Sequence, residues 1–358
     1  MTVGGGGKIR GIRFRGVQRP LRTTFSTALG QKRRLQSILV RVVLDDGVSG
    51  VGEIPTSAAF ADETPSVIAR VLREAGPRLL GAPVDDYGRL IDGLRRDFPQ
   101  TVMTISGLDV ALFRAFLARR QIPEHRYWGG HLGRLETDIT LPFVTDREVL
   151  AAWIGFAARK GFTTYKLKVS GNLDQDRAVL SSVHELLHLR VGRFHLRLDG
   201  NQGYTQKTFL AFLDYIQKER YGIELFEQPL RKDDFHGLAS IKERSPLPII
   251  LDETILSAAD ARRAIDNNLG DGINIKIAKS GIGESTRLLE LARSHRMKVM
   301  IGCMIETMVG LSAAVQLAAG AGSFDFIDLD AVYFLYGKNA YPGIEREGPA
   351  FLVDSADQ

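Results

Sequence analysis

The feature that most constrains this chain is a regular alternation, from about residue 137 onward, of short apolar segments with amphipathic helical segments. The strand-like segments are 137–143, 164–169, 194–199, 223–228, 248–253, 272–277, 298–303 and 324–329. Strands separated by helices need crossover connections, which make neighbouring strands parallel. The count of eight predicts an α/β fold of the TIM-barrel type. An open doubly wound sheet is the alternative, but its glycine-rich phosphate loop is missing, and 170-SGN-172 is the nearest candidate.

A different pattern precedes the barrel repeats. Residues 8–53 alternate as strands do, with a hairpin turn signal at Asp45-Asp46-Gly47, and residues 64–122 change to a helical period. At 358 residues the chain also exceeds what one hydrophobic core usually supports. The sequence therefore predicts a separate α+β unit before the barrel.

Charged residues follow the carboxyl ends of the predicted barrel strands. They are Lys168, Asp199, Glu227, Asp252, Lys276 and Asp328. In barrels of this type the functional residues lie at the carboxyl ends of the strands. A random scatter of surface charge would not follow the strand ends, so these residues are candidates for the active site.

Three of these residues are acids on successive strands: Asp199, Glu227 and Asp252. Neighbouring strand ends lie about 5 Å apart, so three carboxylates there would strongly oppose one another's ionisation. A hard divalent cation removes that conflict, which predicts one Mg²⁺ per subunit. The alternative is that Asp199 and Asp252 each cap the following helix. Three acids at equivalent positions fit that reading poorly.

The lysines predict acid–base chemistry. Lys166 and Lys168 share a face of one strand, and each should make the other easier to deprotonate. Lys276 ends a strand on the opposite side of the acids. Two amines on opposite faces of a metal-bound substrate can remove a proton α to a carboxylate and return it with inversion. Lys279 is interpreted as a surface lysine.

Five short pieces of sequence carry a family resemblance: 166-KLK-168, 199-DGNQGY-204, 227-EQP-229, 252-DE-253 and 274-NIKIAKSGI-282. In this order they resemble the enolase superfamily, and within it the muconate-lactonizing subgroup. The resemblance implies a (β/α)7β barrel over 128–330 and an α+β capping domain over 1–127, to which 331–358 returns. Two capping loops, about 19–31 and 54–64, should then cover the site.

The resemblance also implies residue roles. The metal ligands are Asp199, Glu227 and Asp252, and the catalytic lysines are Lys168 and Lys276, assisted by Lys166. Asn201, Cys303 and Met304 are expected to contact substrate. Residues 302–310 hold no histidine, which argues against the mandelate-racemase subgroup.

Asp328 and Asp330 resemble the Asp-x-Asp signature of dipeptide epimerases, where the pair receives the free α-ammonium of the substrate. The resemblance therefore implies inversion of the C-terminal residue of an L,L-dipeptide. A solvated loop pair or a helix cap remains the alternative for the two acids. N-acylamino-acid racemase, o-succinylbenzoate synthase and muconate cycloisomerase remain alternative activities, although two acids beside the site argue against them.

The identity of the dipeptide is less constrained. Ala-Glu epimerases carry an arginine directly after a Thr-Ala-Leu-like stretch, whereas 27-TAL-29 is followed here by Gly30. That departure argues against Ala-Glu specificity and leaves room for a larger or uncharged side chain. Asp62 and Glu63 in the second capping loop would favour a cationic one.

Composition excludes several other classes. The net charge of +5 comes from basic residues scattered through helical segments, so nucleic-acid binding is not expected. The single cysteine permits no disulfide within the chain, and no signal peptide is apparent, which together predict a cytoplasmic location. Segment 309–322 is too short to span a membrane and predicts a packed helix.

By analogy with family members the chain could form a homo-oligomer. A barrel protein that has lost its catalytic activity is disfavoured, since all three metal-ligand positions and both lysine positions carry the expected residue types.

Overall fold

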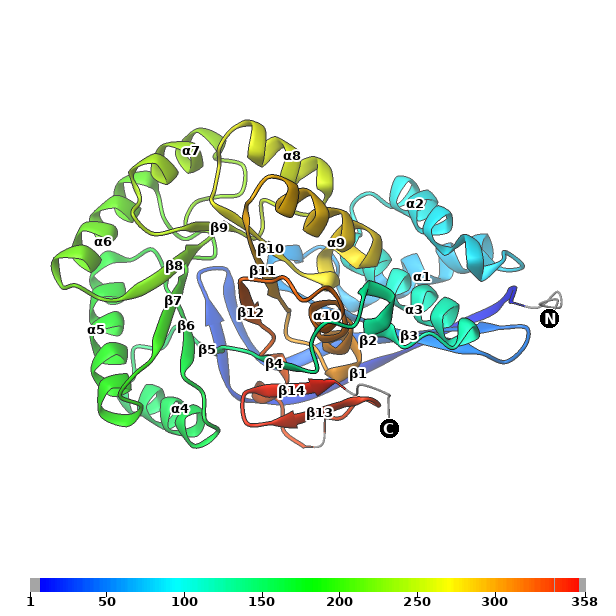
Figure 1. Ribbon diagram of the computed structural model, residues 1–358, viewed down its shortest axis with the longest axis horizontal. Coiled ribbons are helices and arrows are strands. Elements are labelled where there is room, and N and C mark those ends of the chain that lie inside the picture. Colours follow the sequence, from blue (N-terminus) through cyan, green and yellow to red (C-terminus); the bar gives the residue numbers. More distant parts are fainter. Residues whose placement is uncertain (1–6, 338, 354–358) are drawn as a thin grey trace.

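The computed structural model describes residues 7–337 and 339–353, and a ring of strands surrounded by helices dominates it (Figure 1). One sheet holds eight strands in the order β5 to β12, paired in parallel throughout. These strands are β5 (Ile139–Leu141), β6 (Thr164–Lys168), β7 (His195–Asp199), β8 (Ile223–Glu227), β9 (Ile249–Leu251), β10 (Gly272–Ile275), β11 (Lys298–Gly302) and β12 (Phe326–Asp328). Every predicted barrel strand is therefore confirmed.

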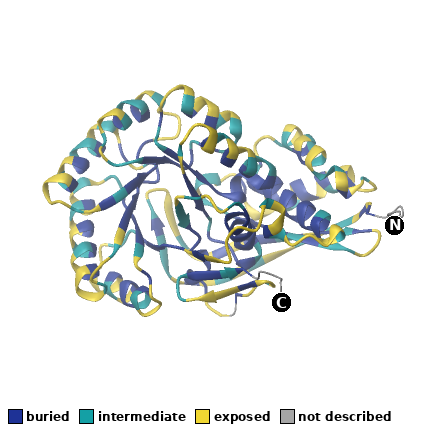
Figure 2. Cartoon of the chain, viewed as in Figure 1, coloured by how far each residue is buried: buried dark blue, intermediate teal, exposed yellow. Residues whose placement is uncertain are grey.

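Seven helices alternate with these strands, as a (β/α)7β barrel requires. They are α4 (Arg147–Arg159), α5 (Leu173–Arg190), α6 (Gln206–Lys218), α7 (Phe235–Arg244), α8 (Ala258–Asp266), α9 (Ile277–Ser294) and α10 (Met308–Ala321). Figure 2 shows the strands buried inside the ring and the outer faces of the helices exposed. The segment predicted as a packed helix is α10, which is buried over most of its length. Among the described residues, no helix has both the length and the apolar character needed to cross a membrane.

The ring closes where its first and last strands meet. The backbone N–H of Asp138 donates to the carbonyl of Ile327 at 3.1 Å, and the N–H of Leu329 donates to Oγ1 of Thr137 at 2.7 Å. These contacts bring the ends of β5 and β12 together, so acids at both strands come within reach of one another.

The α+β unit contains an antiparallel sheet and three helices. The sheet has the order β1 (Ile9–Thr27), β2 (Gly30–Leu44) and β3 (Ser49–Pro55), and the helices are α1 (Pro65–Leu79), α2 (Tyr87–Asp97) and α3 (Val102–Arg120). The predicted Asp-Asp-Gly turn joins β2 to β3. Helix α3 lies directly on β3 at Gly52, where an added Cβ would come within 2.0 Å of the Gly107 carbonyl oxygen. Only glycine allows an approach this close.

The first predicted capping loop is a hairpin instead. β1 continues to Thr27 and β2 starts at Gly30, with Phe25 directly opposite Lys32 in the antiparallel register. Pairing across an irregularity between Pro20 and Phe25 extends the ladder to the tip. The family resemblance implied a capping loop here and does not specify how far the two strands pair. The second capping segment follows β3 and includes the short 3₁₀ helix η1 (Ala58–Phe60).

The chain after β12 contacts both parts of the molecule. It contains η4 (Ala331–Phe334), β13 (Ile344–Glu347) and β14 (Ala350–Val353), and β14 pairs with β4 (Arg134–Glu136) at the entry to the barrel. Leu335 also bridges to Leu21 of the β1–β2 hairpin, and Nε of Arg22 donates to its carbonyl at 3.2 Å. This segment thus anchors the hairpin against the barrel.

Candidate active site at the barrel mouth

The parallel register of β6, β7 and β8 sets the first three site residues at one level. Lys168 is paired with Asp199, and Asp199 with Glu227, as direct neighbours in the ladder. Asp252 and Lys276 each follow the last residue of their strand, β9 and β10. All five side chains are buried, none more than 5% exposed. The barrel geometry therefore brings together the residues that the sequence singled out.

Lysine ammonium groups lie between the three acids. Nζ of Lys166 is 3.0 Å from Oε2 of Glu227 and 3.9 Å from Oδ2 of Asp199, and Lys168 contacts that same Asp199 oxygen. On the other side, Nζ of Lys276 lies 2.6 Å from Oδ2 of Asp252 and 3.9 Å from Oε1 of Glu227. Each neighbouring pair of acids thus shares an ammonium group. The amines face into the mouth rather than away from it.

Lys166 has a different electrostatic setting from the one expected. It shares a face with Lys168, as predicted, but it also contacts Asp328. Burial lowers the pKa of the Lys166 ammonium, yet the charges of Asp328 and Glu227 outweigh that effect and raise the pKa well above its ordinary value. Lys166 is therefore a permanent cation that links two sets of acids.

Two residues at this site escaped the sequence analysis. Lys279 is only 1% exposed, and its Nζ lies 2.5 Å from Oδ1 of Asp252, so its interpretation as a surface lysine is wrong. It lies three residues beyond Lys276, in the first turn of α9, and reaches back toward the strand end. Nδ2 of Asn274 donates to Oε1 of Glu227 at 2.6 Å. Its position two residues before Lys276, on the same strand face, was the available signal.

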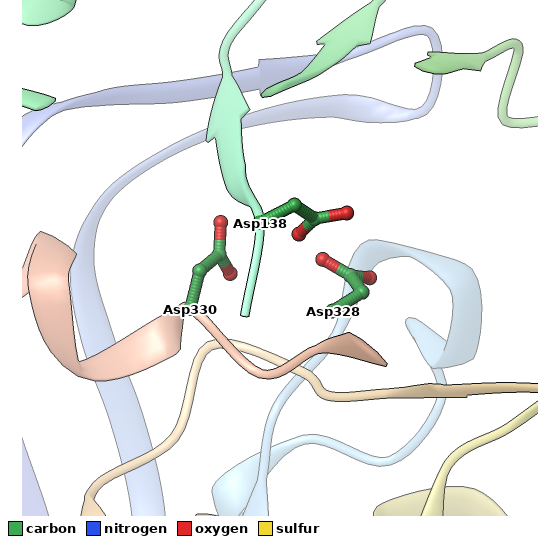
Figure 3. Close-up of side chains that lie close together, drawn as sticks. All are labelled: Asp138, Asp328 and Asp330. Carbon is green, nitrogen blue, oxygen red and sulfur yellow. The ribbon is translucent and has the colours of Figure 1, made fainter. Parts of the chain in front are cut away.

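A second group of acids lies where β5 meets β12 (Figure 3). Carboxylate oxygens of Asp138, Asp328 and Asp330 all lie within 4.8 Å of one another, and each residue is at most 3% exposed. Nη1 of Arg197 donates to Oδ2 of Asp138 at 2.7 Å, and the N–H of Thr140 donates to Oδ2 of Asp330 at 2.5 Å. The solvated-loop and helix-cap readings of Asp328 and Asp330 are wrong, because both are buried and neither side chain caps a helix.

Arg197 and Lys166 each contact one acid of this second group, and the burial of the three carboxyl groups outweighs these cations at Asp138 and Asp330. Burial, and then the charge of Asp328, raises the pKa of Asp138 well above its ordinary value. The same two causes raise the pKa of Asp330 to about 6. Oδ1 of Asp138 is buried without a hydrogen-bond partner among the described residues. Such a site favours a cationic ligand group. Asp138 was missed because it precedes its strand instead of ending it.

A cavity at the mouth is walled by the barrel and by the capping segments together. The barrel contributes the lysines and all the residues expected to contact substrate: Asn201, Cys303, Met304, Asp328 and Asp330. The cap contributes Phe25, Leu29, Gly30, Lys32 and Phe60. Asp62 and Glu63 are not in its wall. Glu63 is buried and accepts hydrogen bonds at 2.8 Å from the N–H groups of Met103 and Thr104, so the expectation that it favours a cationic substrate is wrong.

The chemistry of the donor set can be tested against Mg²⁺. The three acids provide hard oxygen ligands of the type that Mg²⁺ prefers. Beside them, Oδ1 of Asn201 and Oε2 of Glu253 are buried without hydrogen-bond partners among the described residues. Burial and the charge of Asp252 raise the pKa of Glu253 to about 8. These unsatisfied oxygens beside three hard carboxylates fit a divalent cation at this end of the barrel.

Comparisons with known proteins follow the same division of the chain. Residues 9–123 match the N-terminal domain described as mandelate racemase / muconate lactonizing enzyme, and residues 149–345 match the one described as enolase C-terminal domain-like.

Several characterised proteins resemble nearly the whole chain. The chain is 33% identical over 350 residues to the hydrophobic dipeptide epimerase of Citrifermentans bemidjiense, covering 95% of this chain and 93% of that protein. It is 31% identical over 341 residues to the aromatic dipeptide epimerase of Herpetosiphon aurantiacus, covering 95% and 94%. The crystal structure of the dipeptide epimerase from Enterococcus faecalis V583, complexed with Mg and L-Leu-L-Tyr, has a TM-score of 0.89 at 27% identity, covering 97% of each chain.

Proposed function

The chain belongs to the mandelate racemase / muconate lactonizing enzyme family, and we propose that it is a Mg²⁺-dependent dipeptide epimerase. The family resemblance and the barrel fold predicted from the sequence are confirmed. The observation that carries the proposal is the pair of buried amines, Lys168 and Lys276, on either side of three acids. Relatives that are named dipeptide epimerases support the substrate class.

In this proposal each group of acids binds one end of the substrate. Asp328 and Asp330 receive the free α-ammonium of the dipeptide. They suit this cation because they are buried beside a third carboxyl group, that of Asp138. Asp199, Glu227 and Asp252 would hold Mg²⁺, which stabilises the negative charge that develops on the substrate carboxylate. The two ends of the dipeptide are thereby fixed, and the α-carbon of its C-terminal residue lies between the lysines.

The two lysines move the proton. One amine removes the α-proton from its face of the substrate, and the other ammonium donates a proton to the opposite face, so the stereocentre is inverted. Which lysine acts as the base depends on the configuration of the substrate. Lys166 stays protonated between Glu227 and Asp328, and its contacts with both fix the two groups of acids relative to each other.

The cap favours an apolar C-terminal residue. The ring of Phe25 lies 5.8 Å from Nζ of Lys168, next to the expected reacting carbon. Phe25, Leu29, Phe60 and Met304 make most of this part of the wall apolar. Gly30 has open space around its Cα, where Ala-Glu epimerases carry their arginine. These features support a larger, uncharged side chain.

A deuterium-exchange screen tests the proposal. The protein with Mg²⁺ is incubated in D₂O with a library of L,L-dipeptides and, separately, with N-succinylamino acids. We expect deuterium only at the α-carbon of the C-terminal residue of dipeptides, most rapidly for apolar residues, as measured by mass spectrometry. A Lys168→Ala/Lys276→Ala double variant, which lacks both proposed bases, controls for contaminating enzymes. Exchange into N-succinylamino acids without exchange into any dipeptide would replace the proposal with N-acylamino-acid racemase activity.

A further inference from the structure

Helix α9, which follows the proposed catalytic residue Lys276, is built in two parts. Its first turn closes on Lys276, because the N–H groups of Lys279 and Ser280 donate to the Lys276 carbonyl at 3.0 and 3.1 Å. The helical geometry then breaks at Gly281, which has a φ of 72° and a ψ of −175°. A positive φ favours glycine, and a serine–glycine pair is a common cause of such a kink. The first turn therefore needs support from outside the helix.

Two side chains of the α+β unit bind the backbone on either side of this break. Oδ2 of Asp109, on α3, accepts from the N–H of Ile282 at 2.9 Å and from that of Gly283 at 3.4 Å. Nη2 of Arg95, on α2, donates to the carbonyl of Ser280 and lies 3.6 Å from Oδ2 of Asp109. Asp109 thus acts as an N-cap for the second part of α9, and Arg95 holds the end of the first turn.

This contact is buried and charged. Asp109 is only 1% exposed, and burial raises its pKa to about 6 against the opposing charge of Arg95, so the carboxylate is ionised at pH 7. A negative charge stabilises the N-terminus of a helix. An added Cβ at Gly281 would overlap Oδ2 of Asp109 and come within 2.7 Å of Nη2 of Arg95. Ala278, in the first turn, also packs in the hydrophobic core of the α+β unit. The α+β unit therefore holds both the backbone and a side chain of this turn.

The same turn reaches the proposed active site on its other side. Nζ of Lys279 lies 2.5 Å from Oδ1 of Asp252, and Nζ of Lys276 lies 2.6 Å from Oδ2 of the same carboxylate. A short stretch of backbone therefore connects Asp109 to the proposed base on this side of the mouth. The opposite base, Lys168, lies on β6 and is held by the parallel pairing of that strand with β5 and β7.

We propose that Asp109, together with Arg95, is a positioning residue for Lys276. The α+β unit would then set one of the two bases, whereas the barrel alone sets the other. This inference rests on the proposed epimerase function. Loss of the Asp109 contact should weaken proton transfer on the Lys276 face of the substrate and spare the Lys168 face. A residue that only stabilised the folded chain would affect both faces equally.

The test compares proton exchange on the two faces. Each pure stereoisomer of one apolar dipeptide is incubated with Mg²⁺ in D₂O, and NMR gives the initial rate of α-deuterium incorporation. The Lys276→Ala variant identifies the isomer whose α-proton faces Lys276. We expect Asp109→Ala to slow exchange of that isomer by at least about tenfold relative to the other isomer. Arg95→Met should shift the ratio in the same direction, and Asp109→Asn, which keeps one acceptor oxygen, should restore part of it.

Arg114→Ala is the matched control. Arg114 lies on the same helix α3, but it joins the α+β unit to α10, where it donates to the carbonyl of Val309 and to Oγ of Ser312, both at 2.7 Å. Its loss should lower the melting temperature and leave the ratio of the two exchange rates at the wild-type value.

Backbone amide exchange, followed by mass spectrometry, tests the contact without any substrate. The segment 277–283 should exchange faster in Asp109→Ala than in the wild-type protein or in Arg114→Ala. Unchanged amide exchange would overturn the proposal, and so would faster amide exchange with an unchanged isomer ratio. A wild-type protein that labels no dipeptide would instead overturn the proposed function, and amide exchange would still decide whether Asp109 holds the turn.

Discussion

The barrel mouth and the cap wall the same cavity, but they are built in different ways. The mouth takes its polar residues from strand ends that recur with the βα repeat, and the parallel ladder pairs Lys168 with Asp199 and Asp199 with Glu227. The cap takes its residues from a hairpin tip and from the segment after β3, which meet only in the tertiary structure. The difference suggests that the mouth determines the reaction, whereas the cap determines which dipeptide is used.

The largest expected effect is at the lysines of the mouth. Removing either amine should lower epimerisation by at least about 10²–10⁴-fold, the usual range for a general base. A Lys276→Ala variant should still exchange the α-proton of the one stereoisomer whose proton faces Lys168, and Lys168→Ala should show the opposite preference. NMR in D₂O on each pure stereoisomer measures this.

Lys160→Ala, at the exposed end of α4, is the matched control and should exchange both isomers at the wild-type rate. If Lys168→Ala and Lys276→Ala each lost exchange of both isomers equally, the two-base scheme would be wrong, although the site could still be catalytic.

The acids of the mouth should show the next largest effect. Asp252→Asn removes one negative charge from the proposed metal site. We therefore expect kcat to fall by about 10²–10³-fold and Mg²⁺ binding to weaken. Calorimetric titration with Mg²⁺ and the Mg²⁺ dependence of the rate measure the two effects. Glu290→Gln on the exposed face of α9 is the control. Unchanged Mg²⁺ affinity in Asp252→Asn would remove Asp252 from the ligand set.

Asp328 and Asp330, which lie at the β12 side of the mouth, should affect binding more than turnover. Losing a hydrogen bond to a charged group costs about 1.5–3 kcal/mol, so Asp330→Asn should raise KM for dipeptides about 10–100-fold. The pKa of Asp330 is raised to about 6. KM should therefore rise in the wild-type enzyme as the pH falls below about 6, because the protonated acid cannot pair with an ammonium group.

The stability of the protein changes in the opposite direction over this range. Between the ordinary aspartate pKa of 3.8 and about 6, the folded state keeps the Asp330 proton that the unfolded chain has lost. This group's contribution to the free energy of unfolding therefore declines as the pH rises through that window. A pH series of chemical denaturation of wild type and Asp330→Asn measures it. Identical profiles for the two proteins would exclude the titration.

The sequence predicted the mouth better than the cap for a physical reason. Asp199, Glu227 and Asp252 could be found because a βα repeat fixes which residue faces the mouth. Lys279 was misread because it reaches back from a helix turn, and Asp138 was missed because it precedes β5. In the cap, the side-chain directions depend on pairing between Phe25 and Lys32 across the hairpin. No local pattern specifies that register, and the family resemblance implied only a capping loop over about residues 19–31.

The smallest expected effect is at Lys32, and it tests the role of the cap most directly. This half-buried lysine lines the cavity opposite Phe25, and its Nζ contacts the carbonyl oxygen of Thr56 and lies 3.3 Å from Oγ1 of Thr56. Burial lowers the pKa of Lys32 to about 8. It is the one cation in the cap part of the wall among the described residues, so it should favour whatever acidic C-terminal side chains the enzyme accepts.

A Lys32→Met variant should therefore discriminate further against dipeptides ending in glutamate. An ion pair of this exposure is worth about 1 kcal/mol, so the ratio of kcat/KM for apolar over acidic residues should rise about fivefold. In the wild-type enzyme the same ratio should rise above about pH 8, as the Lys32 ammonium loses its charge. Competition between L-Ala-L-Leu and L-Ala-L-Glu in one D₂O reaction measures both. An unchanged ratio in Lys32→Met would show that Lys32 only ties the hairpin to the segment after β3, and would assign selectivity to the apolar wall around Gly30.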